Sequence, residues 1–252
     1  MAFDYDNYVP VEYLESNGDP YIETDIPLYD GTAEMDVSFN AINTSTSYQV
    51  LMGGRSTNGI AVFLLTRNSA LGYGYKGTWK GGLASYAADT RYLITTDLLP
   101  SPASAKMNVN GTDYGVQGNF SALPSPSAYY YEIFSYNQKS SGSAHQYPCT
   151  SGVKLYSLKW YDASGILQYN FVPCRTKDAT PVGGLYETIN EKFFGNAGTG
   201  SFTFGSDISS GSNVYLKING SWVQADTVYI KSGGTWIPAT QVYIKDSGSW
   251  TS

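Results

Sequence analysis

Short runs of alternating apolar and polar residues follow one another along most of the chain, bounded by Gly, Asn, Asp and Pro. A period of two is typical of half-buried β-strands, and these runs recur about every ten residues with little helical periodicity between them. One stretch, Gly183 to Asn196, could hold one or two helical turns, but it is short and rich in glycine. Because parallel strands need long crossover segments, the pattern predicts an all-β, antiparallel sandwich.

Two of the expected strand pairs contain their own turns. Asn110-Gly111 separates two alternating runs, and this dipeptide favours a hairpin turn in which both central residues have positive φ. Asp162 to Gly165 occupies a similar position between two strand-like segments. We therefore expect a hairpin at each of these places.

The end of the chain repeats one small unit. Val-Tyr, then lysine, glycine and tryptophan recur at a spacing of 14 residues, and each unit predicts two short strands joined by a turn. A Ser/Gly/Asp-rich stretch from Phe204 to Asn213 precedes the repeats. We therefore expect an N-terminal arm at residues 1–10, a sandwich at 11–205 and a β-hairpin repeat region at 206–252.

Hairpins of this size expose much of both faces, so their aromatic residues need a partner surface. The repeat region can pack on the sandwich, associate with further copies of the chain, or bind another protein. Aromatic side chains are enriched in such interfaces. The candidate assembly residues are Trp222, Trp236, Trp250, Tyr215, Tyr229 and Tyr243.

Composition and charge limit the kinds of partner that the protein is expected to bind. Only 14% of the residues are charged, and 27 glycines and 23 tyrosines agree with many short strands and tight turns. The net charge of −6, without a run of basic residues, argues against nucleic-acid binding. No stretch approaches the roughly 20 apolar residues of a membrane helix, and we expect neither membrane insertion nor a secretion signal. The two cysteines, Cys149 and Cys174, are expected to be free thiols, although a bridge between them stays open.

Several segments resemble a known family. EYLESNGDPYIETDI, from Glu12 to Ile26, resembles the opening strand of concanavalin-A-like, laminin-G-type jelly rolls found in phage virion proteins and gut bacterial surface proteins. LYSLKWYDASGILQYNFVPC and GLYETINEKFFGNAGTGSFTFG resemble the closing elements of that family, with Glu187 where it has Asp and Phe194 where it has Tyr. The resemblance implies a jelly-roll sandwich.

The C-terminal units are similar to the V-Y-x-K-x-x-G-x-W repeats that close tail and fibre proteins of tailed phages. Together the two resemblances imply a protein exposed on the phage virion, made in the host cytoplasm without a signal peptide. They also imply other virion proteins as partners and a homo-oligomer, with a trimer favoured.

Some jelly rolls are glycoside hydrolases, whose catalytic strand carries three carboxylates. Here Glu34 and Asp36 share a face, but Ser38 and Phe39 stand where the third carboxylate is needed. His145 lies in a polar loop without a nucleophile motif, so we expect it to be solvent-exposed. The oxygens of Asn108 to Asp113 fit a hairpin turn better than a calcium loop. We therefore expect no enzyme, no metal and no cofactor.

The stretch from Gly72 to Tyr86 is the best candidate for a ligand surface, because aromatic faces beside glycine stack on sugar rings. Its candidate residues are Tyr73, Tyr75, Trp79 and Tyr86, with Lys76 and Lys80 nearby, and Arg55 at the same rim. Two alternatives remain: the tyrosines cover the core of a sheet, or they form a subunit contact.

Three functions are consistent with this sequence. The first is a lectin-like virion module that binds host surface carbohydrate or protein. The second is a purely structural virion component, for decoration or connection, without a glycan ligand. The third is a hydrolase that has lost, or relocated, its acid/base carboxylate.

Overall fold

The computed structural model describes residues 3–56, 59–75, 78–100, 103–117, 129–138 and 145–208, and the backbone of six short strands between 215 and 251. The chain divides into two compact units, Met1–Ser206 and Asp207–Ser252. This division lies within one or two residues of the boundary expected from the Ser/Gly/Asp-rich stretch. Among the residues just given, no helix is long and apolar enough to cross a membrane.

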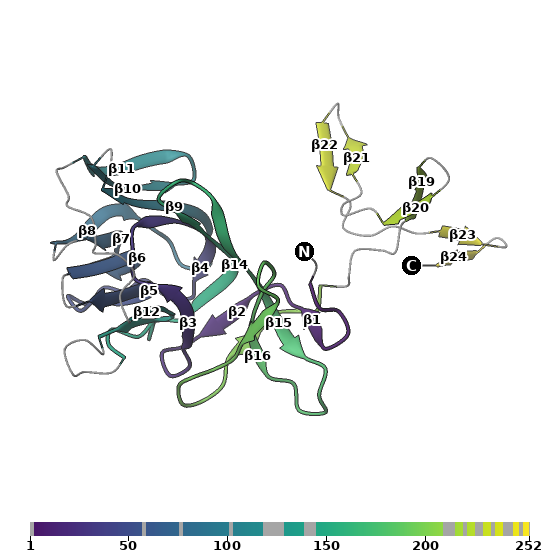
Figure 1. Cartoon of the computed structure of the whole chain (residues 1–252), viewed down its shortest axis with the longest axis horizontal. Coiled ribbons are helices and arrows are strands. Elements are labelled where there is room, and N and C mark those ends of the chain that lie inside the picture. Colours follow the sequence, from purple (N-terminus) through teal and green to yellow (C-terminus); the bar gives the residue numbers. More distant parts are fainter. Residues whose placement is uncertain are drawn as a thin grey trace. The chain divides into compact units, whose positions relative to one another are not determined.

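The first unit contains a large antiparallel sheet (Figure 1). Its strands follow the order β11 (Thr112–Gln117), β10 (Ala103–Val109), β9 (Arg91–Pro100), β4 (Gly31–Phe39), β14 (Val153–Asp162), β15 (Leu167–Thr176), β16 (Gly183–Glu187) and β17 (Lys192–Phe194). Three short strands join it at the side: β1 (Tyr8–Pro10) pairs with β15, and β2 (Leu14–Ser16) pairs with β14 and β18 (Thr203–Phe204). Part of the expected N-terminal arm is thus a strand of the sheet.

A second sheet has the order β3 (Ile22–Pro27), β12 (Tyr130–Ile133), β5 (Gln49–Ser56), β6 (Gly59–Arg67), β7 (Ala70–Tyr75) and β8 (Thr78–Ser85). We call it the seven-stranded sheet, because β13 (Ser135–Asn137) also pairs with β5. The chain reverses direction at Phe134, whose φ is 66°, so that β13 runs parallel to β5 while β12 runs antiparallel to it.

The two sheets enclose one apolar core. On β3, Ile22 and Ile26 are fully buried, while Glu23 between them is exposed, as expected for a strand with one face on the core. Trp160 of β14 is also fully buried and packs edge-on against Tyr29 at 4.7 Å. Because residues of both sheets contribute to this cluster, the prediction of an all-β antiparallel sandwich is confirmed.

Both expected hairpin turns are confirmed. Asn110 and Gly111 have φ of 49° and 86° and connect the paired residues Val109 and Thr112. At the other turn the Gly165 N–H donates to the carbonyl oxygen of Asp162 at 2.9 Å. The Asp162 carboxylate accepts further hydrogen bonds from the N–H groups of Ser164 and Ile166.

The expectation of helical turns between Gly183 and Asn196 is wrong. This segment forms the hairpin of β16 and β17. The fully buried Glu187 carboxylate holds its turn by accepting hydrogen bonds from the N–H groups of Ile189 and Asn190, at 2.9 and 2.6 Å. These contacts satisfy the buried carboxylate oxygens and replace the hydrogen bonds that a helix would have made.

In the second unit, each repeat has the backbone of a two-stranded hairpin, as predicted. The strands are β19 (Tyr215–Ile218) with β20 (Ser221–Gln224), β21 (Tyr229–Ser232) with β22 (Thr235–Pro238), and β23 (Ile244–Asp246) with β24 (Ser249–Thr251). The register is the same each time, with Lys opposite Trp in every hairpin. Tyr243 lies outside the described residues.

Both cysteines are free and buried, as expected. Burial raises the pKa of the Cys149 thiol well above its usual range and that of Cys174 to about 12. The Cys149 Sγ also donates a hydrogen bond to the carbonyl oxygen of Val50 at 3.1 Å. At neutral pH both groups therefore remain protonated and shielded from solvent.

We predict that a disulfide-exchange reagent titrates no thiol in the native protein at pH 7 to 8 and two thiols after unfolding in denaturant without reductant. The raised pKa values keep the thiolate fraction negligible until unfolding returns both groups to their ordinary range near 8.5. The measurement is the absorbance of the released leaving group. A count of zero in denaturant would show a disulfide instead.

Candidate functional site

One row of paired residues crosses the seven-stranded sheet on the face that points away from the core. Residues directly opposite each other on neighbouring strands lie on the same face. The pairings place in this row Glu23, Glu132, Gly53, Val62, Gly74 and Trp79. The outer face thus has carboxylates on β3 and β12 and an indole on β8, with two glycines between them.

Aromatic rings gather at the β8 side of this face. Trp79 stacks on Tyr48 at a centroid distance of 4.5 Å and lies 5.5 Å from Tyr136 and 5.8 Å from Tyr147. We call these four residues the outer aromatic cluster. Tyr136 is buried, whereas Trp79, Tyr48 and Tyr147 are only partly buried. The cluster therefore presents several ring edges and faces to solvent.

Small residues and close backbone packing on β7 make room for the indole. A Cβ built on Gly74 would lie 3.3 Å from Cε3 of Trp79, tighter than most contacts of this kind. A Cβ on Gly72 would meet the Lys80 carbonyl oxygen at 1.9 Å, so β8 approaches β7 in a way that only glycine permits.

Two arginines accompany the cluster. The Arg67 guanidinium lies 4.6 Å from the centre of the Tyr48 ring and donates a hydrogen bond to the Tyr48 hydroxyl at 2.7 Å. Arg55 is exposed, and its charge partly offsets the effect of burial, which raises the pKa of Tyr136. The buried Tyr136 hydroxyl has no hydrogen-bond partner among the described residues.

Three of the five predicted ligand-binding residues do not face a ligand, and for them the prediction is wrong. Tyr73, Tyr75 and Tyr86 are buried in the core between the sheets. Tyr73 donates to the carbonyl oxygen of Ala105, and Tyr75 donates to the Asp30 carboxylate. On β7 the tyrosines point inward and the glycines outward, which is the alternative of core tyrosines raised by the sequence. Trp79 and Arg55 remain at the surface, and Lys76 lies outside the described residues.

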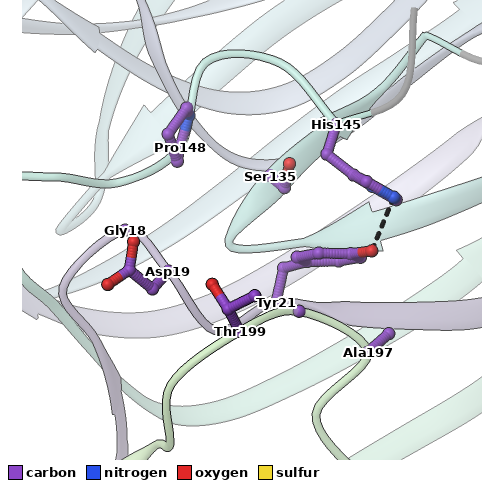
Figure 2. Close-up of a pocket in the computed structure, with 9 residues that line it drawn as sticks. Gly18, Asp19, Tyr21, Ser135, His145, Pro148, Ala197 and Thr199 are labelled. Atoms are coloured by element: carbon purple, nitrogen blue, oxygen red, sulfur yellow. Dashed lines mark hydrogen bonds between the residues drawn. The ribbon is translucent and has the colours of Figure 1, made fainter.

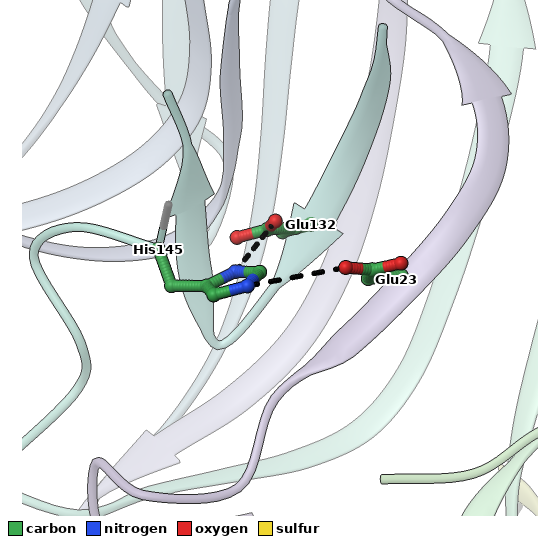
Figure 3. A group of neighbouring side chains, drawn as sticks. All are labelled: Glu23, Glu132 and His145. Carbon is green, nitrogen blue, oxygen red and sulfur yellow. Dashed lines mark ion pairs between the residues drawn. The ribbon is translucent and has the colours of Figure 1, made fainter. Parts of the chain in front are cut away.

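A polar cluster lies on the same outer face, on β3 and β12 (Figure 3). Glu132 is fully buried, and its Oε1 lies 2.8 Å from Nδ1 of His145. The other ring nitrogen, Nε2, lies 2.5 Å from the Tyr21 hydroxyl oxygen and 3.9 Å from Oε1 of Glu23. Since the His145 side chain is only 27% exposed, the expectation of a solvent-exposed loop histidine is wrong.

Burial and charge set the protonation of this cluster. Burial raises the pKa of Glu132, and His145 beside it opposes that rise. Burial, with the charges of Glu23 and Glu132, raises the pKa of Tyr21 to about 12, so the phenol stays protonated. One imidazole nitrogen and one oxygen from each of Glu23 and Glu132 lie within 4.8 Å of one another, close enough to hold a metal ion.

A pocket of about 390 Å³ adjoins His145 (Figure 2). Tyr21 and His145, joined by a hydrogen bond, form one side of it, and Asp19 and Thr199 also line it. The remaining lining comes from Gly18, Ser135, Pro148, Ala197 and Gly198. No motif in the sequence predicts this site. Its one available signal was an acidic residue, Glu132, inside the otherwise apolar run YYYEIF, because buried carboxylates require a partner.

The carboxylates considered for catalysis form ion pairs with basic neighbours on β9 and β14. Glu34 lies 2.9 Å from Lys159, and Asp36 forms a two-point contact with Arg91 at 2.7 and 2.8 Å. Both pairs are partly exposed on the large sheet. They occupy the solvated side of β4, as the sequence analysis expected.

Comparisons with known proteins support the fold. No family model matches the chain, and no curated protein matches it. A solved structure described as a putative carbohydrate binding protein from Bacteroides ovatus is similar, with a TM-score of 0.56 and 11% sequence identity. The match covers 80% of this chain and 61% of that protein, so this chain matches less than two thirds of its length. At this identity the likeness shows a shared fold.

We predict that Tyr86→Phe lowers the free energy of unfolding by about 1 to 2 kcal/mol, because it leaves the buried Asn43 N–H without its acceptor. That N–H donates to the Tyr86 hydroxyl at 2.7 Å. Denaturant unfolding measures the change. Unchanged stability would contradict the structural role of the Tyr86 hydroxyl.

Proposed function

We propose that the sandwich is a non-enzymatic, lectin-like carbohydrate-binding module and that the outer aromatic cluster is its ligand surface. The observation that carries this proposal is the partly exposed Trp79, stacked on Tyr48 and flanked by Tyr147. These rings are fixed by the apolar residues beneath them, Val50, Ile60, Val62 and Leu65. A rigid aromatic surface binds at little cost in side-chain entropy.

The chemistry of the cluster suits a sugar. The C–H face of a pyranose stacks on an indole or phenol ring, while its hydroxyl groups require hydrogen-bonding partners at the rim. Arg55 is exposed near Tyr136, and a guanidinium can donate two hydrogen bonds to neighbouring hydroxyl groups. The fold likeness to a protein described as carbohydrate-binding is consistent with this assignment.

Within this proposal, the module belongs to the virion of a tailed phage and contacts a glycan or protein on the host surface. The support is the sequence resemblance of the sandwich and of the repeats. A second candidate function is a purely structural virion component. It is favoured by the three hairpins with identical register, which repeat one backbone unit three times in the second compact unit.

We predict that Trp79→Ala weakens glycan binding by roughly 30-fold, the effect of losing an anchor worth about 2 kcal/mol. Binding is first located on a glycan array with the full chain and then measured by calorimetry. Tyr5→Ala is the matched control, since Tyr5 is 48% exposed and lies on the N-terminal segment that joins the large sheet.

Loss of binding in both variants would indicate a general effect on the fold, and circular dichroism checks this directly. Undiminished binding by Trp79→Ala contradicts the assignment of the outer aromatic cluster. If the full chain binds no glycan and a particle reconstruction places it between other virion proteins, the structural alternative replaces the lectin proposal.

We predict that replacing Trp222 and Trp236 together by serine converts a homo-oligomer, with a trimer favoured, into a monomer. Interface tryptophans contribute a few kcal/mol each when they anchor a contact, and symmetry multiplies the effect. Light scattering gives the molar mass of both proteins at equal concentration. A monomeric parent, or an unchanged mass in the variant, contradicts a role of these residues in self-assembly.

A further inference from the structure

Two carboxylates lie directly opposite each other on the outer face of the seven-stranded sheet. Glu132 of β12 pairs with Glu23 of β3 in the antiparallel register, so their side chains emerge side by side. Like charges in this arrangement destabilise a sheet, and Glu132 is in addition fully buried. The buried carboxylate of Glu132 therefore requires a polar or positively charged partner close by.

His145 contacts both carboxylates but does not satisfy that of Glu132 (Figure 3). Although its Nδ1 is 2.8 Å from Oε1 of Glu132, the contact lacks hydrogen-bond geometry. Neither that nitrogen nor either oxygen of Glu132 has a hydrogen-bond partner among the described residues. A buried carboxylate and a buried imidazole nitrogen thus face each other with unused lone pairs.

We propose that Glu23, Glu132 and His145 bind a first-row divalent cation, with Zn²⁺ the preferred ion. Their ligand atoms lie within 4.8 Å of one another. Around a tetrahedral zinc ion, with bonds of about 2.0 to 2.2 Å, neighbouring ligand atoms lie about 3.4 Å apart. Rotation of the Glu23 side chain, which is 45% exposed, closes the remaining gap. A charge of +2 neutralises both carboxylates.

Tyr21 orients the imidazole in this site. With the proton on Nε2, the ring donates to the Tyr21 oxygen, 2.5 Å away, and the lone pair of Nδ1 points toward Glu132. Metal-binding histidines are regularly fixed in this way by a hydrogen bond from their second nitrogen. Solvent reaches the site past the exposed Glu23 and through the adjoining pocket, so water completes the coordination.

The donor set decides which ion is preferred. Imidazole nitrogen with carboxylate oxygen suits Zn²⁺, Ni²⁺ and Cu²⁺, whereas Ca²⁺ and Mg²⁺ prefer shells of six or more oxygens. Three protein ligands on one side also leave an open position, unlike the closed shells of structural zinc sites. This site is independent of the outer aromatic cluster and does not require the lectin proposal.

The test uses the untagged full chain after removal of metals with a chelator. Calorimetry with ZnCl₂ should give one site per chain, and zinc should raise the melting temperature in proportion to the logarithm of its free concentration. Ca²⁺ and Mg²⁺ at the same concentrations should not. Co²⁺ serves as the spectroscopic probe: visible bands without thiolate charge transfer exclude binding through Cys149 or Cys174.

Substitutions distinguish zinc binding at this site from zinc binding elsewhere on the protein. His145→Gln and Glu132→Gln should each weaken zinc binding by at least about tenfold, because even residues that only support a ligand have effects of this size. Glu34→Gln is the matched control, since Glu34 is a partly exposed carboxylate on the other sheet, and it should bind zinc like the parent.

Glu132→Gln has a second expected signature, an increased melting temperature in the metal-free state, because it removes a buried carboxylate that lies opposite a second one. Circular dichroism establishes that each variant is folded, and Glu132→Gln alone decides the question if His145→Gln does not fold. The proposal is overturned if no stoichiometric zinc binding occurs, if both variants bind as the parent does, or if calcium binds in preference.

Discussion

The alternation of side chains along the strands of the seven-stranded sheet governs what this protein can bind. Each strand directs one set of residues into the core and the other outward, and the pairing of strands aligns the outward sets into rows. Ile22 and Ile133 point inward, so Glu23 and Glu132 must emerge next to each other on the outer face. A shift of one residue in either strand would bury the opposite set and abolish the pairing of these two carboxylates.

The segment from His145 to Pro148 connects the carboxylates of that face with the outer aromatic cluster. His145 contacts the carboxylates, and Tyr147, two residues later, joins the outer aromatic cluster. Between them, Gln146 exchanges backbone hydrogen bonds with Tyr136 at 3.0 Å in both directions. This short bridge fixes the segment across the sheet and places a polar and an aromatic side chain on either side of it.

The features predictable from the sequence are those set by residues close together in the chain. Asn110-Gly111, the turn at Asp162 and the backbone of the three repeat hairpins follow from local conformational preference. Alternation also shows that Tyr73 and Tyr75 share a face, but it cannot tell which face is the core. That choice depends on the large sheet, which packs against one face of β7: Tyr73, for example, donates to the carbonyl oxygen of Ala105 on β10. The contact of His145 with Glu132 and Tyr21 joins three distant segments, and no local pattern encodes such a contact.

The glycines of the β7–β8 hairpin limit which positions near Trp79 can carry other side chains, in natural relatives or in an engineered library. Position 72 cannot accept a side chain, because the Lys80 carbonyl oxygen occupies its space, and position 82 has a φ of 78° that disfavours one. At Gly81 a Cβ would meet only ordinary contacts, at 3.8 Å or more. Beside Trp79, substitutions can therefore occur at a few positions such as 81. The backbone that supports the indole has to keep its conformation.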